Sequence, residues 1–365
     1  MVVLYHAHLG GLSGGFIGVD VFFAISGYVI TNSLTKSPGP FFAYLTSFYA
    51  RRVRRLLPVA TIVIVATVFF VYHYLTYYTG QGEVTSAIWV ALFAGNVHFA
   101  AVGTQYLTAT DPPSTLQQFW SLAVEEQFYL AWPVIFYGLR SLSRRFSHTR
   151  DWLSIIVLAL LCVTSLLWCH LQVGQNPSWA FFSPLTRFWE IGVGALLAVV
   201  EKQLTILRRP SLGWLSVLGY AVIAYYAFTI DANTTWPDFV TALPVLGAVL
   251  VILGASYGQP DPAARLRTLG RPLEWMGEIS YSWYLVHWPV TMIATLYSFS
   301  PLPAHSRVEL ALASVAIAAL LHYLVENPFR YNSFLAQRKG LTLSLGAVFI
   351  LLSVLCSLGR LHNIL

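Results

Sequence analysis

The sequence predicts an all-α fold, a polytopic bundle of transmembrane helices. Of the 365 residues, 57% are hydrophobic and only 10% are charged, whereas soluble domains carry about 25% charged residues. The apolar residues form continuous runs of about 18 to 22 residues, the length of a membrane-spanning helix, and not the short alternating strands of a membrane barrel. The net charge of +6 comes mainly from arginines between the runs, which favours membrane orientation over nucleic-acid binding.

Eleven candidate membrane segments follow one another along the chain. They lie near residues 17–34, 56–75, 84–102, 119–138, 152–170, 184–200, 212–229, 239–257, 279–298, 308–326 and 341–358. Residues 1–9 have the character of the last part of a further helix. We therefore expect about ten crossing helices, an N-terminal helix remnant and one re-entrant or interfacial segment.

Basic loops predict which sides the helix ends occupy, because loops rich in Lys and Arg stay in the cytoplasm. The basic stretches are 51–55, 140–150, 202–209, 265–271 and 330–339. Three apolar segments separate the first two of them, so one segment should not cross. We assign this role to 84–102, which Gly95, Asn96 and His98 interrupt. Such a backbone is tolerated at membrane depth only where protein covers it.

The domain organisation expected from this pattern is simple. Residues 1–340 form one transmembrane domain, and 341–365 add a transmembrane helix and a short outer stub after a polar break near Gln337. No HExxH motif and no paired-cysteine spacing occurs in the sequence, so a metal site is not predicted.

Two adjacent carboxylates lie within an apolar segment, "FWSLAVEEQFYLAWP", at residues 119–133. A charge near the bilayer centre costs roughly 2.5–3.5 kcal/mol, so Glu125 and Glu126 each need a partner. Adjacent helix positions diverge by about 100°, and the two cannot share one. Two hypotheses stay open: pairing with an arginine or the backbone, or a catalytic or substrate-facing role.

Two further acids have simple structural explanations. Asp20 lies at the predicted start of a helix, where a carboxylate complements the helix dipole, and this reading is favoured over catalysis. Glu326 precedes Arg330 by four residues, the spacing of an ion pair along one helix face. Both acids remain secondary candidates for the site.

Two histidines lie in apolar segments, His6 in "VVLYHAHLG" and His287 in "ISYSWYLVHWPV". A lone histidine in such a helix is usually a satisfied hydrogen-bonding group. Together with buried carboxylates, however, an imidazole can serve as a general base that a carboxylate orients.

Four arginines in "FYARRVRRLLPV", Arg51, Arg52, Arg54 and Arg55, form one broad basic face directly before Pro58. Proline suits the first turn of a helix, so a membrane helix is expected to begin here. Arginine forks onto phosphate oxygens, but basic residues also anchor membrane topology. The residues alone do not separate a topology anchor from a phosphate site.

Six motifs, in this order, resemble one family. They are "LYHAHLGGLSGGFIGVDVFFAISGYVIT", "FYARRVRRLLPV", "FWSLAVEEQFYLAWP", "FWEIGVGALLA", "ISYSWYLVHWP" and "VENPFR". The chain is similar over nearly its whole length to bacterial membrane acyltransferases of the acyltransferase 3 type. This group includes O-antigen and peptidoglycan O-acetyltransferases.

The resemblance implies an enzyme of the bacterial inner (cytoplasmic) membrane. It would move an acyl group, usually acetyl, from cytoplasmic acyl-CoA to a hydroxyl of an extracytoplasmic glycan such as lipopolysaccharide or another cell-envelope polymer. Acetyl-CoA would be a donor substrate and not a permanently bound cofactor. The partners are then acyl-CoA, the glycan and the lipid bilayer, with no nucleic acid.

The resemblance also implies roles for residues. His6 matches the family's essential histidine, and the four arginines match the motif that meets the donor nucleotide. The hypothesis is that His6 acts as base or acyl relay while Glu126 orients it. Recurrent family positions of less certain role are matched by Asp20, Glu125, Glu126, His287 and Glu326.

Two departures from the family pattern qualify these expectations. The family carries an arginine about ten residues before the first-helix histidine, and many members carry a C-terminal SGNH-type domain. The chain is therefore expected to be truncated at its N-terminus and to lack that domain. The alternative function is a proton-coupled transporter or flippase, because buried acids and broken helices also suit a carrier.

Overall fold

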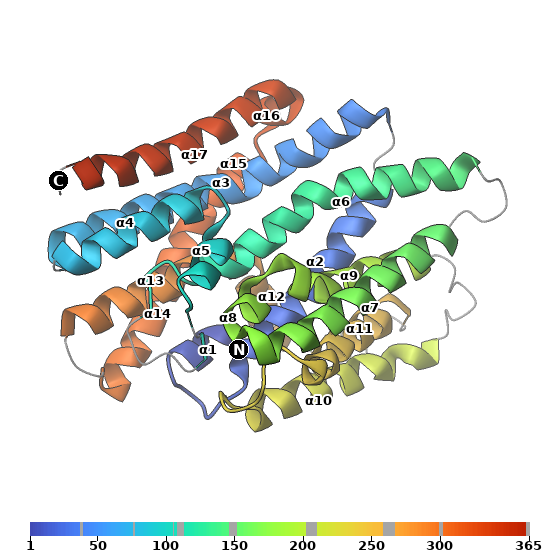
Figure 1. Ribbon diagram of the computed structural model, residues 1–365, viewed down its shortest axis with the longest axis horizontal. Helices are drawn as coiled ribbons and strands as arrows, with labels where there is room; N and C mark the ends of the chain where they lie inside the picture. Colours follow the sequence, from blue (N-terminus) through green and yellow to red (C-terminus); the bar gives the residue numbers. More distant parts are fainter. Residues whose placement is uncertain are drawn as a thin grey trace.

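The computed structural model describes residues 1–36, 39–75, 77–104, 106–107, 113–145, 152–201, 210–257, 267–298 and 302–362. The regular elements in these ranges are all helical, which confirms the all-α prediction. Seven helical segments in this part of the chain are long and apolar enough to cross a membrane. Many of the long helices run side by side in an elongated bundle (Figure 1).

Most predicted segments coincide with a helix, and the segment 184–200 matches one at both ends. The elements are α1 (Val2–His6), η1 (Gly15–Ile17), α2 (Gly18–Thr35), α3 (Phe41–Tyr74), α4 (Tyr77–Ala91), α5 (Gly95–Ala101), α6 (Phe119–Arg145), α7 (Trp152–Gln175), α8 (Pro177–Phe182), α9 (Pro184–Val200), η3 (Pro210–Gly213), α10 (Trp214–Thr229), η4 (Phe239–Thr241), α11 (Ala242–Tyr257), α12 (Arg267–Glu278), α13 (Ser280–Ser298), α14 (Ala304–Leu321), η6 (His322–Glu326), α15 (Asn327–Arg330), α16 (Ser333–Gln337) and α17 (Lys339–His362).

Helix α3 differs most from the prediction. A membrane helix was expected to begin near residue 56 with Pro58 in its first turn, but α3 runs without a break from Phe41 to Tyr74. Pro58 therefore lies in the helix interior, where it lacks a backbone donor and crowds the carbonyl of Arg54. The prediction was wrong because packed membrane helices tolerate an internal proline. As a result, the four arginines lie along the middle of one continuous helix.

The segment 84–102 is interrupted, as predicted, but the break comes directly before Gly95, Asn96 and His98, which lie inside the next helix. Helix α4 ends at Ala91 and α5 begins at Gly95, with Phe93 between them at a φ of 54°. The Gln127 side chain donates to the Phe93 carbonyl at 2.8 Å, and the fully buried Asn96 donates to the Phe182 carbonyl at 3.1 Å. Protein thus covers the break, as membrane depth requires. The re-entrant or interfacial course of this segment stays a prediction.

Described basic side chains link four helices at one end of the bundle, which we call the basic end. Arg140 of α6 donates to the Thr35 carbonyl at the end of α2 at 3.4 Å, and Lys339 at the start of α17 donates to Ser47 of α3. This end lies to the right in Figure 1. Several predicted basic residues lie outside the described residues, in 146–151, 202–209 and 258–266.

Helix α17 lies along α3 and α4 at one edge of the bundle (Figure 1). A Cβ added at Gly346 would lie 2.9 Å from the Val53 side chain, and Thr61 donates to the Phe349 carbonyl at 3.3 Å. The last helix is therefore closely packed on the bundle. The proposed domain boundary at residue 340 stays a prediction.

Helices α2 and α9 cross with their backbones in direct contact. A Cβ built on Gly27 would lie 1.9 Å from the Ile191 carbonyl oxygen, and one on Gly194 would lie 1.8 Å from the Ala24 carbonyl oxygen. Small residues at helix crossings permit such close approach in membranes. This crossing brings the start of α2 next to the start of α9, where the buried charges lie.

We expect Gly194→Ala to destabilise the protein by about 1–3 kcal/mol, because the added methyl must push apart two backbones. The measurement is thermal unfolding of the detergent-solubilised chain, followed by tryptophan fluorescence. Gly138→Ala is the control, since Gly138 lies on α6 with nothing within 4 Å of its would-be Cβ, and it should leave the midpoint equal or raised. Equal losses in both variants would contradict the close crossing.

Candidate active site

His6 ends α1 and is held in place by the glycine-rich loop that follows. Gly10 and Gly11 adopt φ values of 74° and 67°, in the left-handed region that favours glycine. The Gly14 N–H donates to the Ala227 carbonyl at 2.9 Å. This loop thus ties α1 to the end of α10 and leaves His6 only 8% exposed.

His6 and His287 form a stacked, hydrogen-bonded pair. Nδ1 of His6 lies 2.9 Å from Nε2 of His287, and the ring planes differ by 4°. Nδ1 of His287 lies 3.2 Å from the Trp283 carbonyl oxygen, and Nε2 of His6 lies 3.0 Å from the Tyr106 hydroxyl. The two imidazoles, from α1 and α13, therefore form one continuous chain of hydrogen bonds.

The Trp283 carbonyl, at one end of this chain of hydrogen bonds, determines the tautomers of both histidines. A carbonyl oxygen only accepts, so neutral His287 presents Nδ1–H to Trp283 and keeps Nε2 as an acceptor. His6 then donates its Nδ1–H to His287, and the lone pair of its Nε2 faces Tyr106. An imidazole held in this way can take a proton through Nε2.

The hypothesis that Glu126 orients His6 is not met by this geometry. Both ring nitrogens of His6 are engaged, by His287 and Tyr106. Glu126 instead lies within electrostatic reach of Arg52 and Arg55, and its Oε1 has no hydrogen-bond partner among the described residues. The physical reason is its position on α6, on the side toward α3 and not toward α1. The orienting partner is His287.

A buried loop supports the histidine pair from the side. The Trp288 ring packs edge-on against His6 at 4.5 Å between centroids, and its Nε1 donates to the Ser114 carbonyl at 2.9 Å. Glu83 of α4 accepts from the Thr115 N–H at 2.7 Å and from its hydroxyl at 2.9 Å. The Glu83 carboxylate thus anchors the loop that holds Trp288 against His6.

Glu125 is paired, but not with an arginine. The Ser26 and Tyr129 hydroxyls both donate to its Oε1, and the Arg52 guanidinium lies 4.5 Å from the centroid of the Tyr129 ring. The arginine therefore contacts the carboxylate's partner and not the carboxylate itself. A catalytic role for Glu125 stays a prediction.

A cavity of about 260 Å³ lies beside Glu125, Ser26 and Tyr129. Because α2 and α6 run in the same direction and both end at the basic end, its wall passes from Arg52 and Tyr129 on the side of the basic end, through Glu125, to Ser121 and Tyr284. Most of the remaining lining is apolar. We call this space the donor cavity.

The four arginines are not equivalent. Arg52 and Arg55 line the donor cavity, and Arg51 and Arg54 do not. Arg51 is exposed, while Arg54 is 9% exposed and its Nε has no hydrogen-bond partner among the described residues. Residues three apart share a helix face, which explains why Arg52 and Arg55 point to the same space.

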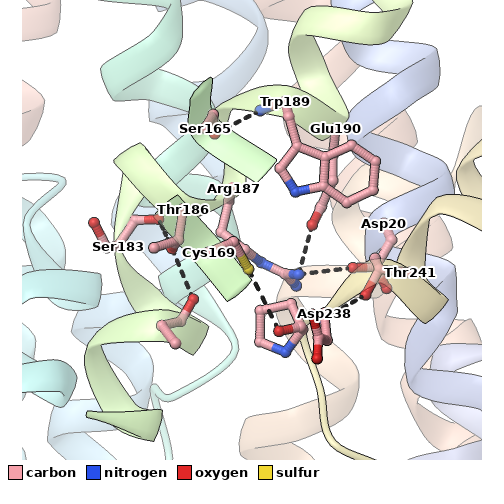
Figure 2. A network of polar contacts seen from close by, with 12 residues as sticks. Asp20, Ser165, Cys169, Ser183, Thr186, Arg187, Trp189, Glu190, Asp238 and Thr241 are labelled. Carbon is pink, nitrogen blue, oxygen red and sulfur yellow. Dashed lines mark hydrogen bonds and ion pairs between the residues drawn. The ribbon is translucent and has the colours of Figure 1, made fainter. Parts of the chain in front are cut away.

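A fully buried arginine links α2 and α9 (Figure 2). Arg187 lies 2.9 Å from Asp20 and 2.6 Å from Glu190, and all three side chains are at most 1% exposed. Asp20 is in the first turn of α2, as predicted, but an ion pair accompanies the helix dipole there. Its role is thus to hold the two helices together.

The same arginine supports Tyr106. Its guanidinium lies over the rings of Phe181 and Trp120, at 5.3 and 5.5 Å from the centroids. Tyr106 stacks on Phe181 at 4.7 Å and thereby faces His6. The buried charges therefore lie one aromatic layer behind the histidine pair.

Glu326 forms the predicted pair with Arg330, at 3.7 Å. It also accepts from Ser282 at 2.8 Å and lies 3.0 Å from Nδ1 of His322. The π-helical turn η6 brings His322 and Glu326 together. This cluster is near the basic end and has no contact with the histidine pair, so it stabilises packing there.

Sequence reasoning missed three residues that shape the site. Tyr106 lies in a polar stretch with no periodic pattern, and no signal in the sequence marks it. Glu83 is a single acid in "TGQGEVTS". Arg187 precedes Glu190 by three residues inside an apolar run, and a cation at membrane depth was a usable signal.

Comparison with known proteins decides the family. The chain matches the acyltransferase 3 family, described as an acyltransferase domain, over residues 1–358. The chain belongs to the acyltransferase 3 family. No solved structure matches it. The comparisons give no support to the transporter alternative.

Three similar members of the family come from three different organisms. Peptidoglycan O-acetyltransferase OatA of Listeria monocytogenes is 30% identical over 351 residues, which are 93% of this chain and 55% of the relative. O-acetyltransferase OatA of Staphylococcus aureus is 26% identical, over 93% of this chain and 57% of the relative. YrhL of Bacillus subtilis is 29% identical, over 91% and 53%. The chain thus spans about half the length of these relatives.

The histidine pair in this acyltransferase domain can be tested by substitution at His287. We expect His287→Leu to lower kcat roughly 10- to 100-fold, because proper orientation of a general base is part of the 10²–10⁴-fold that such catalysis supplies. His287→Gln should retain more turnover, since its amide oxygen can accept from His6. Steady-state kinetics of acyl transfer measure both. Equal losses, or a change in KM alone, would contradict the tautomer assignment.

Proposed function

We propose that this protein is an O-acetyltransferase that moves an acetyl group from cytoplasmic acetyl-CoA to a glycan hydroxyl outside the membrane. One observation carries the proposal. The donor cavity begins at two arginines near the basic end and reaches Tyr284, whose ring lies 5.6 Å from that of His287. A site for an anionic donor and a site for base catalysis are therefore neighbours.

Acetyl-CoA has the chemistry that the donor cavity suits. Its phosphates need cations, and a guanidinium forks onto phosphate oxygens. Arg52 and Arg55 supply two such groups. The largely apolar wall beyond them suits the neutral pantetheine arm. Because basic helix ends stay in the cytoplasm, the basic end faces the compartment that contains acyl-CoA.

The reaction that fits the histidine pair is direct acyl transfer. The acceptor hydroxyl takes the position that the Tyr106 hydroxyl now occupies at Nε2 of His6. As its oxygen attacks the thioester carbonyl, its proton moves to His6, the C–O bond forms and the C–S bond breaks. The departing thiolate of CoA then receives that proton. No acyl-enzyme is required.

The acceptor we favour is peptidoglycan. The Listeria relative is named as a peptidoglycan O-acetyltransferase, and none of the three relatives carries lipopolysaccharide in its name. Peptidoglycan lies outside the cytoplasmic membrane, which fits a base on the side away from the basic end. We accordingly place the protein in the bacterial inner membrane.

Substitution of the two cavity arginines tests whether acetyl-CoA is the donor. We expect Arg52→Gln and Arg55→Gln each to raise KM for acetyl-CoA roughly 10- to 100-fold, because a hydrogen bond to a charged group contributes about 1.5–3 kcal/mol. Isothermal titration with CoA measures binding directly. Arg338→Gln is the control, since Arg338 packs over Phe334 and does not line the cavity. Unchanged CoA affinity in both cavity variants would return these arginines to a topology role.

A further inference from the structure

The donor cavity lies next to the histidine pair but does not reach it. Neither His6 nor His287 lines the cavity, whereas Tyr284 does. Tyr284 also packs against His287, with 5.6 Å between ring centroids. The Tyr284 side chain thus contacts both the cavity and the histidine pair, and it lies at the boundary between them.

Hydrogen bonds hold the Tyr284 ring across this boundary. Its hydroxyl donates to the Gln118 carbonyl at 3.0 Å and lies 2.6 Å from the Ser121 hydroxyl, which then serves as a donor to it. The Gln118 side chain donates in turn to the Leu285 carbonyl at 3.0 Å. The contacts join α6 to α13 at the level of the boundary.

We propose that Tyr284 is a gate between the donor cavity and His6, and that it determines which acyl groups are transferred. This inference rests on the proposed acyl-CoA donor. The reacting atoms must approach to about 3–3.5 Å, so the thioester has to pass the Tyr284 ring. A small displacement of the ring admits an acetyl group, whereas a longer acyl chain requires the ring to leave its place.

The gate also keeps the two sides of the membrane apart. The cavity begins at Arg52 and Arg55 near the basic end, and the histidine pair lies beyond Tyr284. With the ring in place, water from the donor side does not reach Nε2 of His6, and the thioester is kept from hydrolysis. When the ring moves, the Ser121 and Tyr284 hydroxyls become donors for carbonyl oxygens of the pantetheine arm.

Tyr281 provides a matched control on the same helix. It lines the same cavity, but its hydroxyl donates to the Leu56 carbonyl of α3 at 2.7 Å, and its position on α13 is nearly one turn closer to the basic end. Removing its ring enlarges the cavity without opening the boundary to His6.

The experiment compares acetyl-, butyryl- and hexanoyl-CoA with the full chain in detergent and a soluble peptidoglycan oligosaccharide as acceptor. CoA release measures total turnover, and mass spectrometry of the acylated oligosaccharide measures transfer. We expect Tyr284→Ala to raise the kcat/KM ratio of hexanoyl- to acetyl-CoA at least tenfold, and to raise the fraction of acyl groups lost to water several-fold. Tyr281→Ala should keep the wild-type ratio.

Several outcomes would overturn the gate. If Tyr284→Ala lowers kcat/KM equally for all three thioesters, the ring has a packing role only. An equal change of ratio in Tyr281→Ala assigns selectivity to cavity volume. Tyr284→Val, with a smaller change in packing, repeats the comparison if the alanine variant does not fold. Wild-type protein that releases no CoA from any thioester removes the donor and the gate together, whereas wild-type turnover with unchanged selectivity in the variants removes the gate alone.

Discussion

Both halves of the site, the donor cavity and the histidine pair, depend on the ion pairs of the buried Arg187 with Asp20 and Glu190. A cation at this depth is tolerated only with close partners, and Asp20 and Glu190 supply them because glycines let α2 and α9 touch. The crossing fixes α2, which carries Ser26 to the donor cavity. On its other side Arg187 supports the aromatic layer behind Tyr106. One ion network therefore positions the donor side and the base side together.

The cavity arginines lie apart from the histidine pair because phosphates and acyl groups differ in how strongly water solvates them. Phosphates are strongly hydrated and cannot follow an acyl group into a hydrocarbon-covered bundle without cations. In the proposed reaction the nucleotide stays at the basic end and only the slender arm enters. The donor cavity has this form, with Arg52 and Arg55 near one end and largely apolar walls beyond. Its geometry thus matches a molecule that is charged at one end and reactive at the other.

The helices were largely predictable because hydrophobic length is a local property, and residues 184–200 were placed to the residue. The start of helix α3 was not predictable in this way. Pro58 suggests a helix start, and only packing shows that the helix continues through it. Pairwise contacts were harder still. His6 and His287 are 281 residues apart, and each looks alone like a satisfied core histidine. Their pairing depends on how α1 docks on α13, which no local pattern encodes.

A histidine partner in place of a carboxylate has a chemical consequence for the proposed reaction. A carboxylate on Nδ1 of His6 would stabilise the imidazolium that forms when the acceptor hydroxyl loses its proton. Neutral His287 accepts the same hydrogen bond without that charge, so the proton is held less firmly. That suits an acyl transfer whose leaving group is a thiolate, because a thiolate departs without prior protonation and then readily takes up the proton. The pair therefore favours a base that returns its proton quickly over one that retains it.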